Sequence, residues 1–253
     1  MTSNYELKTI SYELNNKINE AFKLHPFSEI PTNCDYKCIM ADYLAMSQAF
    51  PYLQAGSQKD VFWDFMENNK DIPEHVELTT VVGNFLCWDE TGGLYPTMAM
   101  KLKALPKILE TNRFHSNILK RDCYTLFKKE IKPNYTNHTK SYLIKLYNLL
   151  SSNCPITRVA SMVSFENHAN VMISSLWNSI SLAFPIIEKH KLTYFNLHVG
   201  GADPAEKYHV EMTNNLISKI VTQDNYCFFI EKFLEYYGLH HSWCKSLIDF
   251  ACV

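Results

Sequence analysis

The sequence predicts an all-α protein, and three observations support this prediction. Only 7 of the 253 residues are glycine, which leaves few sites for the tight hairpins of β proteins. Apolar residues recur three and four positions apart along most of the chain, which is the spacing of one helix face. No segment alternates apolar and polar residues as a strand does, and we find no repeat or low-complexity linker. We therefore expect one helical domain spanning residues 1–253.

The first half of the chain is expected to form four helices and one further apolar segment. The first helix covers residues 4–24. The second runs from about 33 to 50, where Pro51 should stop it because proline has no N–H to continue the helix. The remaining segments of this half cover residues 61–68, 73–91 and 97–109.

The second half is expected to be built around one central helix. This helix, from about residue 157 to 183, is apolar around most of its circumference, which is typical of a buried element. The last helix starts near residue 225 and is expected to break near Gly238 and then resume. The other predicted helices of this half cover residues 116–131, 139–152 and 203–221.

Composition and charge exclude several classes of protein. A net charge of -2 without a basic run argues against a nucleic-acid partner. No run of about 18 apolar residues could span a membrane, and the N-terminus lacks the features of a signal peptide. The 8 cysteines form no Cys-x-x-Cys pair, so we expect free thiols, mostly buried, in a cytoplasmic protein. Zinc binding by Cys34 and Cys38 is the weaker alternative.

The stretch Asn196–Thr213 carries the strongest chemical pattern. Asp203-Pro204 predicts the N-cap and first residue of a helix. Glu206 and His209 then share one helix face, which is the Glu-x-x-His arrangement of carboxylate-bridged iron sites in helical bundles. The alternative is that Glu206 completes a capping box and that His209 is a hydrogen-bonded core residue.

Three further side chains could join this site. His198 stands just before the chain break that precedes the new helix. Glu166 is a carboxylate within an apolar stripe of the central helix, where an unpaired charge would cost several kcal/mol. It therefore needs a cation, a hydrogen-bond network or a raised pKa, and a salt bridge to Arg158 is the structural alternative. Glu90 ends the 73–91 helix next to Asp89, a position where glutamates are usually solvated.

Together these side chains form a candidate metal site on several helices. Carboxylate oxygen with imidazole nitrogen suits iron or manganese better than thiolate-bound zinc. The candidate metal ligands are Glu90, Glu166, His198, Asp203, Glu206 and His209. Glu90 and Glu166 are also the candidate catalytic residues. The other histidines are expected at a helix end (His25), facing away from Glu166 (His168), exposed (His240), or lining a mouth (His115).

On these residues the chain resembles the heme-oxygenase-like superfamily, and within it the diiron oxidases, also called iron-containing redox enzymes. The resemblance extends to the Chlamydia protein associating with death domains and to a cyanobacterial group. It implies a heme-oxygenase-like (TenA-like) helical bundle. It covers most of the chain and rests on His25-Pro26-Phe27, Met46–Ser57 (MSQAFPYLQAGS), Gly83–Gly93 (GNFLCWDETGG), Glu166 and His198–Met212.

The family's metal site uses Glu and then His on one helix, Glu on a later helix, and His-x-x-x-Asp-x-x-His on another. The ligands that match this pattern are Glu90, Glu166 and His209. Glu206 takes the place of the Asp. Two positions depart from the pattern: no histidine follows Glu90 within two turns, and Ala202 replaces the first histidine of the last motif, with His198 one turn earlier. The resemblance implies Fe(II)/Fe(III), two ions per chain, and leaves the ligands of the second ion open.

The implied activity is that of a non-heme iron enzyme that uses O2 to oxidise a small molecule such as an amino acid or a fatty acid. The candidate pocket residues are Trp88, Tyr95, Arg158 and Phe165, with Lys101 as an alternative to Arg158. The implied partners are the substrate and O2, with a homodimer by analogy.

Rival interpretations use the same fold. One is a thiaminase-II-like hydrolase with Cys87 as nucleophile, or a cofactor-independent oxidase like pyrroloquinoline quinone synthase. Heme binding through His25 has no supporting pattern. A rival from another class is a protein-interaction module whose metal site has degenerated.

Overall fold

The computed structural model describes residues 4–93, 109–200 and 204–252, and the elements within these ranges are helical. This confirms the predicted all-α class. The α-helices are α1 (Asn4–Ala21), α2 (Tyr36–Glu67), α3 (Glu74–Glu90), α5 (His115–Phe127), α6 (Asn137–Leu150), α7 (Pro155–Ala183), α8 (Thr193–Val199), α9 (Ala205–Ile220) and α10 (Tyr226–Ala251). The expected segment at residues 97–109 lies almost entirely outside the described residues.

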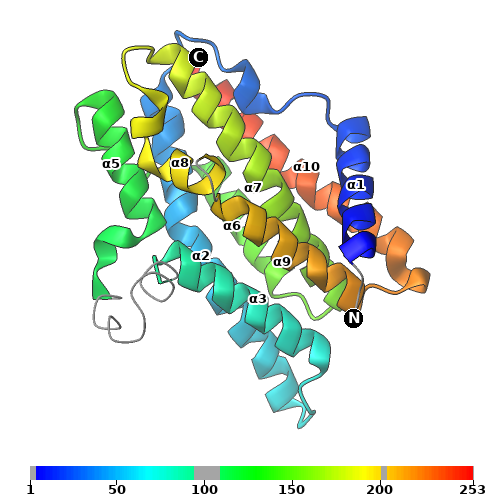
Figure 1. Ribbon diagram of the computed structural model, residues 1–253. Coiled ribbons are helices and arrows are strands. Elements are labelled where there is room, and N and C mark those ends of the chain that lie inside the picture. The colour runs from blue at the N-terminus through cyan, green and yellow to red at the C-terminus, as the bar shows by residue number, and fades with distance from the viewer. Residues whose placement is uncertain (1–3, 94–108, 201–203, 253) are drawn as a thin grey trace.

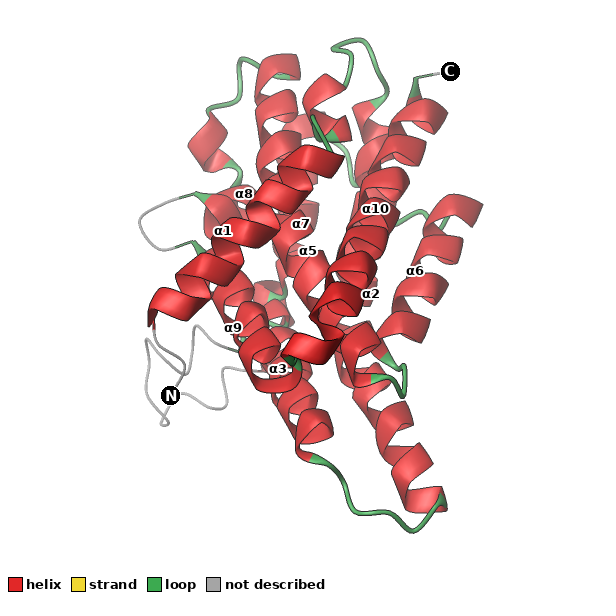
Figure 2. Ribbon diagram, turned by 90° about the vertical axis from the view of Figure 1, so that its right-hand side faces the viewer, coloured by secondary structure: helices red, strands yellow, loops and turns green. Residues whose placement is uncertain are grey.

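Helix α7 is the central element, as its all-round apolar character predicts. It runs through the middle of the bundle and packs against α6, α8, α9 and α10 (Figures 1 and 2). Most of its residues are buried, including apolar side chains such as Val159, Ala160 and Phe165 on different sides of the helix. A helix with neighbours on all sides buries apolar surface around its whole circumference, which is the main source of its stability.

The expected stop at Pro51 is wrong, because α2 continues for four more turns to Glu67. Pro51 is buried inside this helix, where it removes one backbone hydrogen bond. Packing of α2 along both α3 and α6 offsets that loss. The segment predicted as a separate helix at residues 61–68 is therefore the end of α2.

The expected break at Gly238 is also wrong, because α10 is continuous from Tyr226 to Ala251. A Cβ at position 238 would lie 3.4 Å from Cζ of Phe22. The ring of Phe22, just past the end of α1, packs on Tyr237 and His241 at centroid distances of 5.0 and 5.1 Å. A Cβ at that distance would make only an ordinary van der Waals contact, so Gly238 is not needed for space, and the packing of α10 along α7 keeps the helix continuous through it.

The expectation of free thiols fails for two of the eight cysteines. Cys34 and Cys252 form a disulfide that joins the start of α2 to the end of α10, with their Cα atoms 4.8 Å apart. The backbone N–H of Asp35 also donates to the carbonyl of Ala251 at 3.2 Å. Cysteines 218 residues apart in sequence give no local signal of pairing, since only the fold brings them together. Every helix in the described ranges is too short or too polar to span a bilayer.

Candidate metal centre

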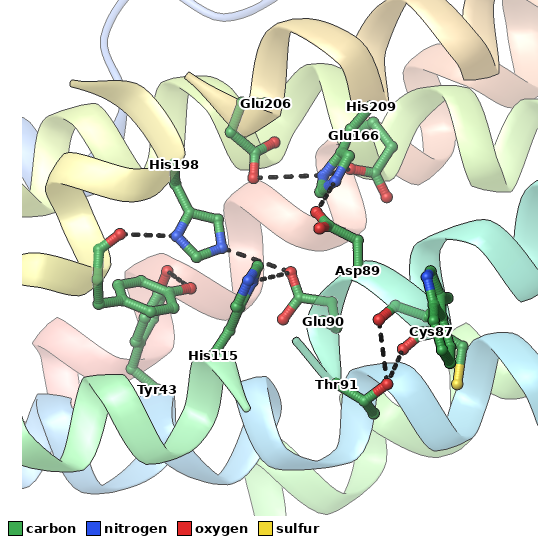
Figure 3. Close-up of polar contacts among 12 residues, drawn as sticks. Tyr43, Cys87, Asp89, Glu90, Thr91, His115, Glu166, His198, Glu206 and His209 are labelled. Atoms are coloured by element: carbon green, nitrogen blue, oxygen red, sulfur yellow. Dashed lines mark hydrogen bonds and ion pairs between the residues drawn. The ribbon is translucent and has the colours of Figure 1, made fainter. Parts of the chain in front are cut away.

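Two trios of buried side chains lie next to each other at the centre of the bundle (Figure 3). Within each trio the potential ligand atoms lie within 4.8 Å of one another. The first trio is Glu90, His115 and His198, and the second is Glu166, Glu206 and His209. Five helices supply these six residues: α3, α5, α7, α8 and α9.

The first trio is arranged around one carboxylate oxygen. Oε1 of Glu90 lies 3.2 Å from Nδ1 of His115 and 3.4 Å from Nε2 of His198. Among the described residues, Nδ1 of His115 meets no other polar partner than this carboxylate, with which its geometry is not that of a hydrogen bond. Burial alone would raise the pKa of Glu90, but the facing imidazoles of His115 and His198 outweigh it and hold this pKa well below its usual range. The carboxylate therefore stays ionised and available to a cation.

The short helix α8 holds His198 in the first trio. Asp122 of α5 accepts hydrogen bonds from the backbone N–H groups of Thr193 and Tyr194, at 2.9 and 2.7 Å, and so caps the N-terminus of α8. One turn later, Nδ1 of His198 donates to the carbonyl of Tyr194 at 2.7 Å. Because a carbonyl can only accept, Nδ1 of His198 carries a proton, and Nε2 is the nitrogen that faces Glu90 and that a cation would bind in place of a proton.

In the second trio two carboxylates face one imidazole nitrogen, that of His209. Nδ1 of His209 lies 3.5 Å from Oε2 of Glu166 and 3.7 Å from Oε1 of Glu206. Its other nitrogen, Nε2, lies 2.7 Å from Oδ2 of Asp89 on α3 and donates to it. An acceptor that binds the outer nitrogen of a histidine is the usual support of a metal ligand, because it fixes the tautomer and the ring orientation.

The charges of the second trio are unbalanced without a cation. Burial raises the pKa of Glu166 to about 7, against the opposing pull of His209, and the nearby Glu206 and Glu90 add to the rise. Burial would lower the pKa of His209, but Asp89, Glu166 and Glu206 raise it well above its usual value. Oε1 of Glu166 and Oε2 of Glu206 are buried and have no hydrogen-bond partner within residues 4–93, 109–200 and 204–252. Unpartnered buried carboxylate oxygens are costly unless a cation satisfies them.

A small cavity separates the carboxylates. Its volume is about 20 Å³, and its walls include Glu90, Glu166, His198 and Glu206. Such a volume holds one water-sized group. The rings of Phe165 and Phe50, stacked at 4.2 Å, and the hydroxyl-bearing ring of Tyr43 close it from the apolar side. The donors, their orphaned oxygens and this void together fit oxygen- and nitrogen-binding metal ions such as iron or manganese.

A third cluster, His25, His168 and Cys244, does not fit a metal ion, because its histidines do not turn free lone pairs toward a common point. The backbone N–H of Phe27 donates to Nδ1 of His25, so the proton of this neutral imidazole is on Nε2. That Nε2 faces Nε2 of His168 at 3.1 Å and has no lone pair for a metal. Burial, aided by His241, lowers the pKa of His25 to about 3, which keeps it neutral.

The structure brings five of the six predicted ligands together and adds two residues, His115 and Asp89, that were not among the predicted ligands. Asp203 lies outside the described residues. Nδ1 of His115 lies 3.2 Å from Oε1 of Glu90, beside which the family pattern has a histidine, and Asp89 accepts a hydrogen bond from Nε2 of His209. His115 is far from Glu90 in sequence and belongs to another helix, so helix spacing could not find it. The available sequence signal was its place just before the helix predicted from residue 116, from which it was expected to line a mouth, and it does line a second, larger cavity of about 1030 Å³.

The predicted pocket residues have different locations. Phe165 lines the small cavity, whereas Trp88 packs against Gly93 and lines neither cavity. Arg158 is buried away from the site and donates to the carbonyl of Ser152 at 2.6 Å and to His75 at 2.8 Å, so the proposed salt bridge to Glu166 is absent. Tyr95 and Lys101 lie outside the described residues.

The expected exposure of His240 is wrong. It is buried and hydrogen-bonds the hydroxyls of Tyr142 and Ser164 at 2.9 and 3.3 Å. His168 faces away from Glu166, as the sequence spacing predicts, and meets His25.

Comparisons with known proteins agree with this architecture. No protein-family model matches the chain, and no curated protein matches its sequence. The structure is similar to a CADD-like protein of unknown function from Nostoc punctiforme, with a TM-score of 0.71 and 10% identity over 99% of this chain and 100% of that chain. It is also similar to a domain of unknown function with a heme oxygenase-like fold from Shewanella denitrificans, with a TM-score of 0.55 and 12% identity over 96% of this chain and 89% of that chain. At such low identities the likeness concerns the fold, and the chain has a heme-oxygenase-like fold.

Proposed function

We propose that this protein holds two iron ions, one in each trio, and uses them with O2 to oxidise a small organic substrate. The observation that supports this most strongly is the orientation of His198 and His209. Each donates its outer nitrogen to a fixed acceptor and turns its inner nitrogen toward buried carboxylates. Bound ferrous ions would supply the electrons that reduce O2 and the oxidant that attacks the substrate.

The side chains of the chain would have three tasks in this reaction. Glu90, Glu166 and Glu206 provide negative charge that favours cations and changes of metal oxidation state. Glu166, whose pKa burial raises to about 7, can hold or release a proton at its unpartnered Oε1. The stacked rings of Phe50 and Phe165 exclude water from the carboxylates.

The hydrolase alternative gains little support from the described residues. Cys87 is half-buried, and burial, aided by Glu90, raises its thiol pKa, which disfavours the nucleophilic thiolate. No cysteine lines either cavity in the described part of the chain.

An anaerobic ferrous titration followed by exposure to O2 tests this proposal. The wild-type chain should bind two ferrous ions and then consume O2. Glu166→Ala should lower O2 consumption more than about 100-fold, because it removes a ligand and not only its support. Glu77→Ala, an exposed glutamate on α3, is the matched control and should behave like the wild type. Failure of the wild-type chain to bind more than stray iron would contradict the proposal.

A further inference from the structure

We propose that the hydroxyl of Ser47 on α2 is the hydrogen-bond donor to a small ligand that binds in the cavity beside the metal centre. The cavity admits a ligand of water size, such as a water molecule, a fluoride ion or one end of O2. This inference rests on the proposed function, because it names the residue that meets the oxygen ligand. The orientation of Ser47 does not depend on iron, so the two proposals can fail separately.

Buried serine and threonine hydroxyls on the helices of this chain usually donate to the backbone of their own helix. Three fully buried hydroxyls donate to the carbonyl three or four residues earlier, each at 3.0 Å, and they belong to Ser57, Ser164 and Thr213. This local bond satisfies a helical hydroxyl without any other group. Ser47 makes no such bond, and its buried Oγ has no hydrogen-bond partner within the described ranges. Its hydroxyl is therefore available to a ligand.

The location of Ser47 gives this free hydroxyl a space to serve. Ser47 lines the cavity of about 20 Å³ together with Glu90, Glu166 and Glu206. A second serine, Ser161 on α7, also has a buried Oγ without a partner among the described residues, but it lines neither cavity. Of these two hydroxyls, that of Ser47 borders a space that can hold a ligand. An unpartnered buried hydroxyl costs free energy, and a ligand in the cavity would remove that cost.

The other possible donors of the cavity are already bonded or must first be protonated. The hydroxyls of Tyr43 and Tyr194 bond each other at 3.1 Å. Nδ1 of His198 donates to the carbonyl of Tyr194 at 2.7 Å. A carboxyl group such as that of Glu166 donates only when it is protonated. Ser47 therefore supplies the free neutral donor on the wall of this cavity.

A hydroxyl in this place favours a ligand that carries negative charge. A hydrogen bond to an oxygen atom becomes stronger as that atom becomes more negative. Reduction of O2 makes its oxygen atoms more negative, so Ser47 would stabilise the reduced ligand more than O2 itself. The stacked rings of Phe50 and Phe165 keep bulk water from competing for this hydrogen bond.

A crystal structure of the metal-free chain, at a resolution that shows ordered water, tests the orientation of the hydroxyl without iron. Oγ of Ser47 should lie within hydrogen-bond distance of an ordered solvent molecule in the cavity. A hydrogen bond from Oγ to the carbonyl of Tyr43 or Leu44, one turn earlier, would overturn the inference. The hydroxyl would then be used by its own helix.

Fluoride binding to the iron-loaded, air-oxidised chain tests the donor role, because fluoride is a one-atom anion that accepts hydrogen bonds. Ser47→Ala should weaken fluoride binding about tenfold or more, since it removes a hydrogen bond to a charged group. Ser161→Ala removes the unpartnered hydroxyl outside the cavity and should bind fluoride as the wild type does. Both variants should still bind two ferrous ions, because neither serine belongs to a trio. Equal fluoride affinities of Ser47→Ala and the wild type would overturn the inference.

Nitric oxide bound to the ferrous-loaded chain gives a readout that a purely structural role of Ser47 would not change. The N–O stretching frequency should shift when D2O replaces H2O, because the serine hydroxyl exchanges its proton for a deuteron. The shift should persist in Ser161→Ala and be lost in Ser47→Ala. An isotope shift of the same size in Ser47→Ala would assign the hydrogen bond to another donor and overturn the inference.

The outcomes separate this inference from the proposed function. A Ser47 hydroxyl bonded to solvent in the cavity of a chain that takes up no iron would keep this inference and refute the proposed function. Two bound iron ions with O2 consumption, but an unchanged fluoride affinity in Ser47→Ala, would do the reverse.

Discussion

Hydrogen bonds of single histidines distinguish a metal site from a buried polar cluster in this protein. His198 and His209 donate outward from one nitrogen and turn the other toward buried carboxylates, whereas His25 accepts from the backbone and turns a proton toward His168. All three are buried, so burial alone would not separate them. The acceptor behind each ring separates them, because it fixes which nitrogen can bind a metal.

Asp89 should therefore matter to iron affinity although it need not touch the metal. Asp89→Ala removes the acceptor of His209 Nε2 and should weaken binding of one ferrous ion by about 10- to 100-fold. Asp249→Ala, an exposed aspartate of α10, serves as the control. Competition with a ferrous chelator measures the effect, and an unchanged affinity in Asp89→Ala would refute the positioning role.

His115 should be needed for one ion and not the other. His115→Ala leaves only two ligands, Glu90 and His198, in the first trio. The number of tightly bound ferrous ions should therefore fall from two to one per chain. His138→Ala, at an exposed histidine on α6, should leave the number at two. Two tightly bound ions in His115→Ala would show that His115 is not a ligand.

The sequence predicted Glu90, Glu166, His198, Glu206 and His209 as one site, and the structure brings these five residues together. Glu206 and His209 follow from local helix spacing, and Glu166 from a charge within an apolar stripe. His115 and Asp89 could not be derived in this way. Their roles depend on which helices are neighbours, and no local pattern contains that information.

At the scale of elements, the helix boundaries show where local rules are overridden. Pro51 and Gly238 are residues that usually end helices, yet both lie inside long helices that pack along several neighbours. Helix α8 shows the opposite case. Its seven residues are too few for a stable isolated helix, and its cap comes from Asp122 of another helix. Sequence reasoning therefore missed α8 although it noted His198.

Asp122 should give the protein a measurable pH dependence. Burial raises its pKa to about 6, although the backbone N–H groups of Tyr194 and Thr193 oppose the rise. Because this value exceeds the unfolded value of about 3.9, the folded chain binds the proton more tightly. The resulting stabilisation is complete below about pH 4 and is lost as the pH rises through 6, a total of about 3 kcal/mol.

Urea unfolding at several pH values measures this contribution. The difference in unfolding free energy between Asp122→Asn and the wild type should change by about 2 kcal/mol between pH 4 and pH 7, in favour of the variant at pH 7. Asp249→Asn should show no such change. A pH-independent difference for Asp122→Asn would contradict the assigned pKa shift.

At the scale of the whole molecule, the fold class and the central helix could be predicted from periodicity, whereas the disulfide that joins distant parts of the chain could not. The disulfide between Cys34 and Cys252 links residues near the two ends of the described chain. Cys252→Ser should lower the unfolding free energy by about 2–4 kcal/mol under oxidising conditions. Cys227→Ser, at an exposed free cysteine, is the matched control. Equal stability of both variants would show that the disulfide does not stabilise the fold.

The central claim is that the two trios hold two metal ions in one heme-oxygenase-like bundle. Anomalous diffraction at the iron absorption edge, from crystals of the ferrous-loaded chain grown without O2, tests it most directly. The claim predicts two anomalous peaks about 3.5–4 Å apart, one contacting Glu90, His115 and His198 and the other contacting Glu166, Glu206 and His209. Absence of peaks there, or a single peak at His25, His168 and Cys244, would contradict it.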